Sequence, residues 1–243
     1  MNAVSDDRPT APGERILYGR RSTHRLRAGR RAAVERKLPD IQIALPPDEG
    51  PLDPAGLFDH TPSELWLEVG FGAGEHLLEQ ARAHPDAGYI GCEPFFDGVA
   101  KLVQALDHED IGNVRIYTDD ARLLLRRLPP SCLAGAFVLF SDPWPKTRHH
   151  KRRFISAPVL DLLAHAMAPG AELRIATDHR GHLVWILEHL HRAEAFEWLA
   201  RRPDDWRRRP PDWPATRYER KAIAEERDCI YLRYWRRDGG RAP

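Results

Sequence analysis

Residues 65–74 have the sequence LWLEVGFGAG, in which a short apolar run ends at three glycines that occupy alternate positions. The apolar run predicts a buried strand, and the periodicity of residues 75–83 predicts a helix directly after the glycines. Glycine is needed where a backbone turns sharply and approaches a ligand closely. Because an open α/β sheet binds ligands at the carboxyl ends of its strands, this turn predicts a ligand site.

The same alternation of strand and helix continues to the end of the chain. Further strands are predicted at residues 89–92, 114–117, 136–140 and 173–176, with helices at residues 95–106, from 121, at 156–167 and at 181–192. This order predicts an α/β fold with a mostly parallel central sheet and helices on both faces. A charged helix at residues 218–226 and an antiparallel C-terminal strand at 229–235 are predicted to complete it.

The composition of the chain limits the class of protein to which it can belong. The chain has 243 residues, of which 42% are hydrophobic and 30% charged, as expected for a globular protein. We predict a disordered lead at residues 1–13, a basic arm with a proline-rich approach at 14–64, and the α/β domain at 65–243. No membrane span or secretory signal is predicted. The three cysteines form no disulfide framework, which favours a cytoplasmic location.

Positive charge is concentrated near the N-terminus. The net charge is only +1, but residues 14–37 hold nine Arg and Lys against two Glu. A polyanion would encounter this segment first.

Three acidic residues follow or end successive predicted strands: Glu68, Glu93 and Asp120. The glycine spacing is G-x-G-x-G and not the dinucleotide pattern G-x-G-x-x-G. Glu68 would repel a pyrophosphate but suits a cofactor with an ammonium group, which favours S-adenosylmethionine over NAD. Glu93 is suited to a ribose and Asp120 to the amine of adenine. The alternative for each is a solvated carboxylate.

The fourth predicted strand leads into FSDPWPK at residues 140–146, and RHHKRR follows at 148–153. Together these stretches resemble the bacterial tRNA (guanine-N7-)-methyltransferases. The turn at residues 68–74, Thr177-Asp178 and the TRYE stretch at 216–219 match that family too, so the resemblance covers residues 65–235. Ser141 departs from the pattern, in which proline is expected before Asp142.

The resemblance implies a Rossmann-like methyltransferase fold and a role for each matching residue. Asp142 would be catalytic and, with Glu68, Gly70, Gly72, Glu93 and Asp120, would contact S-adenosylmethionine. The substrate guanosine would be contacted by Lys146, Asp178, Thr216, Arg217, Tyr218 and Glu219. RNA would be contacted by Arg148, His149, His150, Lys151, Arg152 and Arg153. The family target is guanine 46 in the variable loop of tRNA.

The chemistry of the target agrees with the residues. Guanine N7 has an in-plane lone pair and needs no deprotonation, and the sequence contains no evident nucleophile–base set. His149 and His150 lack suitably spaced partners, so no metal is predicted.

The alternative functions are a small-molecule or protein methyltransferase of the same fold, a non-catalytic RNA-binding module, or an NAD-dependent enzyme. The alternative for residues 148–153 is a solvated loop without a role in RNA binding. The arginines around Trp206 could form a second RNA contact. The oligomeric state, monomer or homodimer, stays open.

Overall fold

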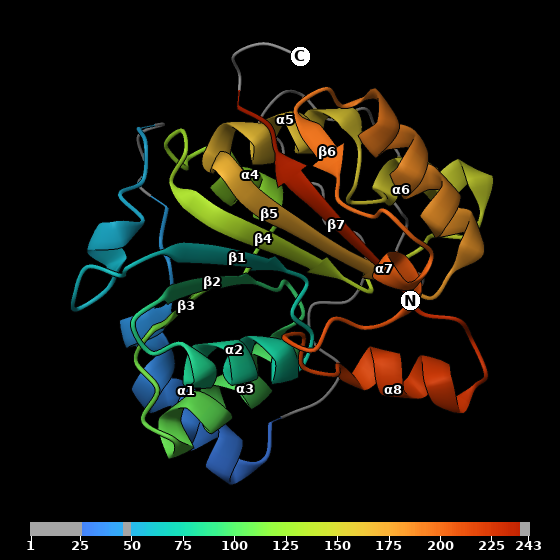
Figure 1. The fold of residues 1–243 in the computed structure, drawn as a ribbon. Coiled ribbons are helices and arrows are strands. Elements are labelled where there is room, and N and C mark those ends of the chain that lie inside the picture. Colours follow the sequence, from blue (N-terminus) through green and yellow to red (C-terminus); the bar gives the residue numbers. More distant parts are fainter. Residues whose placement is uncertain (1–25, 46–49, 239–243) are drawn as a thin grey trace.

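A seven-stranded sheet forms the centre of the molecule (Figure 1). The computed structural model describes residues 26–45 and 50–238, so the predicted lead at 1–13 and the first half of the basic arm lie outside it. The strand order is β3-β2-β1-β4-β5-β7-β6. The strands are β1 (Leu65–Val69), β2 (Gly88–Cys92), β3 (Val114–Tyr117), β4 (Leu133–Leu139), β5 (Met167–Thr177), β6 (Phe196–Trp198) and β7 (Ile230–Arg236).

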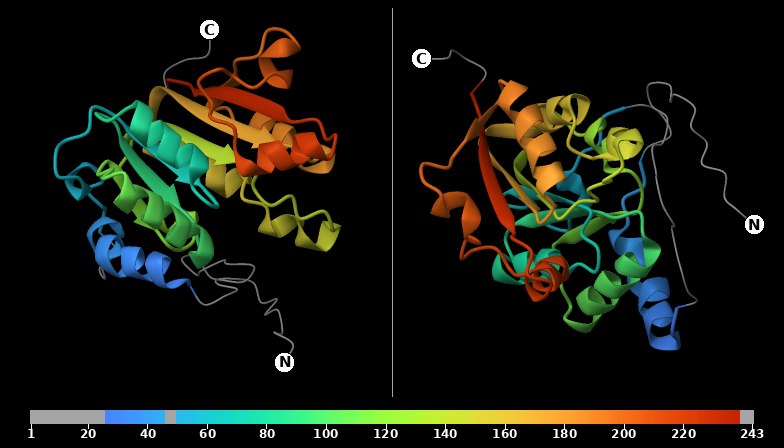
Figure 2. Two further views of the ribbon diagram at one scale, coloured as in Figure 1. Left: turned by 90° about the horizontal axis from the view of Figure 1, so that it is seen from below. Right: turned by 90° about the vertical axis from the view of Figure 1, so that its right-hand side faces the viewer.

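Helices cover both faces of the sheet (Figures 1 and 2). One face packs against α1 (Ala28–Ile41), α2 (Glu75–Ala83) and α3 (Phe96–His108). The other packs against α4 (Ala121–Leu125), α5 (Ala157–Ala166) and α6 (Arg180–Arg192). The short helices α7 (Asp204–Arg207) and α8 (Arg217–Ala224) lie between β6 and β7 in the chain.

The buried strands explain why the sheet forms where the apolar runs predict it. Along β1, the side chains of Leu65, Leu67 and Val69 enter the core beneath α4–α6, while Trp66 faces the opposite core. Strands β1 to β5 are parallel and β7 is antiparallel to β5. The predicted fold class, including the antiparallel C-terminal strand, is therefore confirmed.

Two elements differ from the sequence-based expectation. The segment from residue 28 to 41 is a helix that packs against α3, with Ala33, Leu38 and Ile41 buried. The sequence predicts a basic arm followed by a proline-rich loop for this segment. Arg36 reinforces this contact through an ion pair with Asp107. Strand β6 has three residues and extends the sheet beyond β7.

Among the described residues, no helix is long and apolar enough to cross a membrane.

Candidate active site

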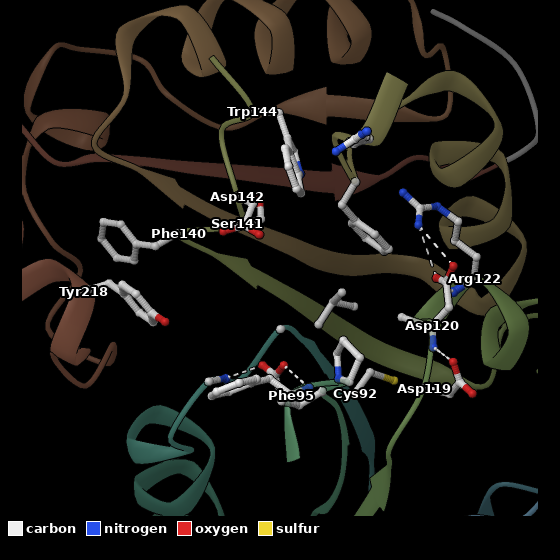
Figure 3. A pocket seen from close by; sticks show the side chains of 18 residues that line it. Cys92, Phe95, Asp119, Asp120, Arg122, Phe140, Ser141, Asp142, Trp144 and Tyr218 are labelled. Carbon is white, nitrogen blue, oxygen red and sulfur yellow. Dashed lines mark hydrogen bonds and ion pairs between the residues drawn. The ribbon is translucent and has the colours of Figure 1, made fainter. Parts of the chain in front are cut away.

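A cavity of about 430 Å³ lies at the carboxyl ends of β1, β2 and β4 and beside the N-terminus of α4 (Figure 3). This volume lies within the usual range for small-molecule sites, roughly 300–1,000 Å³. Five of the six predicted cofactor residues line the cavity: Gly70, Gly72, Glu93, Asp120 and Asp142. Trp144 and Tyr218 also line it, Tyr218 approaching from α8.

The glycine turn follows β1 and forms one wall of the cavity. Gly70 and Gly72 have positive φ angles of 74° and 59°, a conformation that strains other residues. The turn rests on α3, because a Cβ added to Gly98 would lie 2.0 Å from the carbonyl oxygen of Gly72. Glycine is therefore required on both sides of this contact, and the turn is held close to the cavity.

Glu93 is held by the backbone around it. Its carboxylate accepts hydrogen bonds from the N–H groups of Gly72 (2.8 Å) and Phe95 (2.9 Å), and its side chain is buried. Burial raises the pKa of Glu93 to about 7, although the two backbone hydrogen bonds oppose the shift. The group is thus oriented toward the cavity and close to changing its protonation state at neutral pH.

Asp120 has a second function at the site, as the N-cap of α4. One of its oxygens accepts a hydrogen bond from the N–H of Arg122 at 3.0 Å, and the guanidinium of Arg122 lies 3.3 Å from both carboxylate oxygens. The neighbouring Asp119 accepts from the N–H of Asp120 and also lines the cavity. Two carboxylates, those of Asp119 and Asp120, therefore lie at the position where the sequence predicts an acceptor for adenine.

Glu68 does not line this cavity. Its side chain is buried, and one carboxylate oxygen lies 2.8 Å from Nδ1 of His76 on α2. The edge of the His76 ring contacts Phe137, with ring centroids 4.6 Å apart. Glu68 thus lies behind the glycine turn, where it pairs with an imidazole that the sequence did not single out.

Asp142 belongs to the loop at residues 140–146 that leaves β4. Phe140 and Trp144, on either side of Asp142, have positive φ angles of 52° and 41° without being glycine. Such conformations cost about 1–3 kcal/mol each and persist only where the surroundings enforce them. Desolvation by the cavity walls raises the pKa of Asp142. Strain and desolvation therefore coincide in the loop that carries Asp142.

The basic stretch after this loop forms a 3-10 helix over Thr147–Arg152, and its side chains divide into two groups. Arg148 and Lys151 are exposed, as is Lys146 before the helix. The guanidinium of Arg152 lies 5.1 Å from the ring centre of Trp144, and His149 contacts the same ring edge-on. His150 packs against Trp185 on α6. The exposed cations Lys146, Arg148 and Lys151 are accessible to a polyanion. Arg152, His149 and His150 instead pack against Trp144 and Trp185.

Arg153, which was expected to contact RNA together with its neighbours, is turned away from the surface. Its side chain is only 3% exposed, and Nε donates to the carbonyl of Pro143 at 2.8 Å. It therefore points into the protein, toward the loop that carries Asp142.

Of the six residues expected to bind the guanosine, three line one of two cavities, and Lys146, Thr216 and Arg217 line neither. Asp178 and Glu219 line a second cavity of about 980 Å³ between α6, α8 and the start of β7, whereas Tyr218 lines the first. Asp178 forms an ion pair with Arg227. Arg217 is exposed.

Thr216 and Glu219 have clear structural partners. Thr216 caps α8 by accepting a hydrogen bond from the N–H of Glu219 at 3.0 Å. The buried Glu219 accepts from the hydroxyl of Tyr231 at 2.6 Å and pairs with Arg209 at 3.0 Å. The spacing Thr-x-x-Glu is that of a capping box, a signal that the sequence contained.

The cofactor implied by this site fits the residues present. The cavity joins a glycine turn, which leaves room for close approach, to carboxylate acceptors at the ends of neighbouring strands. A parallel sheet with helices on both faces and such a cavity at its carboxyl edge is the arrangement expected of an S-adenosylmethionine-dependent methyltransferase.

Comparisons with known proteins define the family more narrowly. The family described as "Putative methyltransferase" matches residues 62–232. The tRNA (guanine-N(7)-)-methyltransferase of Rhodospirillum rubrum is 47% identical over 91% of this chain and 88% of its own. The protein of the same name from Jannaschia sp. is 42% identical over 96% of this chain and 99% of its own. The chain belongs to the tRNA (guanine-N(7)-)-methyltransferase family.

Solved structures support the fold alone. The 16S rRNA methyltransferase KamB matches with a TM-score of 0.53 and 18% identity, over 73% of this chain and 89% of its own. The [4+2]-cyclase SpnF matches with a TM-score of 0.51 and 17% identity, over 73% and 76%. One of these two proteins is named as a cyclase, so the fold by itself does not define the reaction.

Proposed function

We propose that this chain transfers a methyl group from S-adenosylmethionine to N7 of guanine in tRNA, with guanine 46 of the variable loop as the target. The main observation in favour is the strained loop that holds Asp142 at the cavity and leads directly into the exposed cations Arg148 and Lys151. A methyl donor and a polyanion would thus meet at one place. The names of the relatives support the same substrate.

Positioning supplies most of the catalysis in this proposal. S-adenosylmethionine, when bound, supplies the methyl group. Guanine N7 attacks without prior deprotonation, so the chain needs no general base and instead aligns the two reactants, an effect worth roughly 7–11 kcal/mol in favourable cases. The purine becomes positively charged on methylation, and the carboxylate of Asp142 stabilises that charge from the cavity wall.

Recognition of the guanine is assigned to residues near the ends of β4 and β5 and at the start of α8. Asp178 would accept hydrogen bonds from N1–H and N2–H₂ of the guanine, after separation from Arg227. Tyr218, whose side chain lies beside Gly72, would contact the guanosine at the edge of the cofactor cavity. Thr216 and Glu219 would act by holding α8, and Lys146 and Arg217 are exposed and available to the nucleotide.

The RNA surface in this proposal is centred on the exposed Arg148 and Lys151, with the partly buried His149, His150 and Arg152 beside them. Phosphate contacts of this kind set the register of an RNA but do not read its sequence. The choice of guanine would therefore depend on Asp178 and α8, while affinity would depend on the cations.

Methyl transfer from labelled S-adenosylmethionine to unmodified tRNA, followed by mapping of the modified base, tests this proposal. We expect 7-methylguanosine at position 46 and no label in a tRNA with adenine at that position. Label in small molecules or proteins, but not in tRNA, would contradict it.

A further inference from the structure

Arg153 lies between the loop that carries Asp142 and helix α6. Its Nε donates to the carbonyl of Pro143 at 2.8 Å, and its Nη1 donates to the carbonyl of Gly181 at 3.3 Å. A weaker contact of 3.5 Å joins Nη2 to the carbonyl of Trp144. Within residues 26–45 and 50–238, its polar partners are backbone carbonyls and not carboxylates. The guanidinium of Arg153 therefore connects the backbone of the Asp142 loop to the backbone of α6.

Helix α6 provides the other side of this arrangement. The guanidinium lies 5.1 Å from the ring centre of Trp185, and Nε1 of Trp185 donates to the carbonyl of Ile155 at 2.6 Å. Nearby His182 is fully buried, and burial together with the charge of Arg153 lowers its pKa to about 4. His182 is thus neutral near pH 7, where Arg153 supplies the buried charge at this position.

The geometry of the guanidinium suits a clamp, by which we mean a side chain that binds two backbone segments at once. Its planar fork directs donors in fixed directions, so one side chain can hold two backbone segments in register. Two of the three carbonyls belong to Pro143 and Trp144, directly after Asp142, and Trp144 has a left-handed backbone. A loop strained in this way needs contacts that enforce its conformation.

We propose that Arg153 is a positioning residue, which acts on methyl transfer by holding the Asp142 loop against α6 and does not contact RNA. The inference rests on the proposed function, because methyl transfer to tRNA is the reaction affected. A misplacement of about 1 Å at a reacting centre can reduce the rate roughly hundredfold, so loss of the clamp should affect kcat. Exposed neighbours such as Arg148 would instead affect affinity for tRNA.

The test compares Arg153→Lys and Arg153→Gln with the wild-type full-length protein. For Arg153→Gln we expect kcat at saturating tRNA and S-adenosylmethionine to fall by roughly 10- to 100-fold. Arg153→Lys, which keeps the charge but loses the fork, should show a smaller loss. Both should keep the tRNA Kd, its salt dependence and the cofactor Kd within about twofold. Arg192→Ala, at an exposed position near the end of α6, serves as a matched control with unchanged kcat.

Three outcomes would overturn the inference. A normal kcat in both variants would show that the clamp does not affect the reaction. Weaker tRNA binding with a flatter salt dependence would identify Arg153 as an RNA contact. Loss of cooperative melting and of cofactor binding in both variants would show a general structural role. Failure of the proposed function is distinguishable, because the wild-type protein would then not methylate tRNA.

Discussion

At the scale of single residues, Glu93 links cofactor binding to pH. Its pKa in the free protein is raised to about 7 by burial. Ribose hydroxyls need a carboxylate that accepts hydrogen bonds, so the bound state favours the ionised form. We therefore expect S-adenosylmethionine affinity to rise as pH increases through 7 and to fall below it. Calorimetry between pH 5.5 and 8.5 measures this, and Glu93→Gln should bind more weakly and lose that part of the pH dependence. A wild-type affinity that is flat across this range would exclude the role.

Asp142 is the residue on which we propose that the chemical step depends. Asp142→Asn keeps the shape of the side chain but removes its charge, so we expect a loss of methyl transfer of roughly 100-fold or more. Single-turnover assays with excess enzyme measure the step directly, and an unchanged melting temperature serves as the control for folding. Normal turnover in this variant would remove Asp142 from the catalytic assignment.

At the scale of elements, helix α8 depends on its cap. Thr216→Ala removes the hydrogen bond to the N–H of Glu219, a change that typically costs about 1 kcal/mol. Because α8 carries Tyr218 to the glycine turn, fraying of its first turn should raise KM for both substrates more than it lowers kcat. Thr216→Ser keeps the hydroxyl and should behave like the wild-type protein. Equal behaviour of the two variants would show that the cap is unimportant.

The sequence predicted the strands well because apolar runs such as Leu65–Val69 are buried on both faces of a parallel sheet. It did not predict α1, because only three of its residues are buried and because its many arginines and Pro39 are not typical of an amphipathic helix. The three-residue β6 is too short to produce a pattern.

For the candidate site, sequence spacing predicted which residues gather at the carboxyl edge but not which way their side chains turn. Arg153 is indistinguishable from Arg152 by residue type, yet one is buried and the other partly exposed. Glu68 similarly turns toward His76 behind the glycine turn. Burial of a charged side chain depends on partners distant in sequence, such as Gly181 for Arg153.

At the scale of the whole molecule, tRNA binding should depend on salt through the exposed cations beside the cavity. Each phosphate contact contributes about −0.9 (duplex) or −0.7 (single strand) to the slope of log K against log salt. Arg148→Ala with Lys151→Ala should therefore weaken tRNA binding and flatten that slope by roughly one to two units. Cofactor affinity should not change. An unaltered slope would mean that these residues form only a solvated surface.

The contact between Gly98 and the glycine turn limits how this protein can be engineered for heat resistance. Replacing a helical glycine by alanine is a common stabilising substitution, worth about 0.4–1 kcal/mol where the backbone tolerates it. At Gly98 the added methyl group would meet the carbonyl oxygen of Gly72 at 2.0 Å, and backbone cannot move aside as a flexible side chain would. A consensus or design protocol that scores α3 by helix propensity alone would therefore select a substitution that displaces the turn in the wall of the cavity.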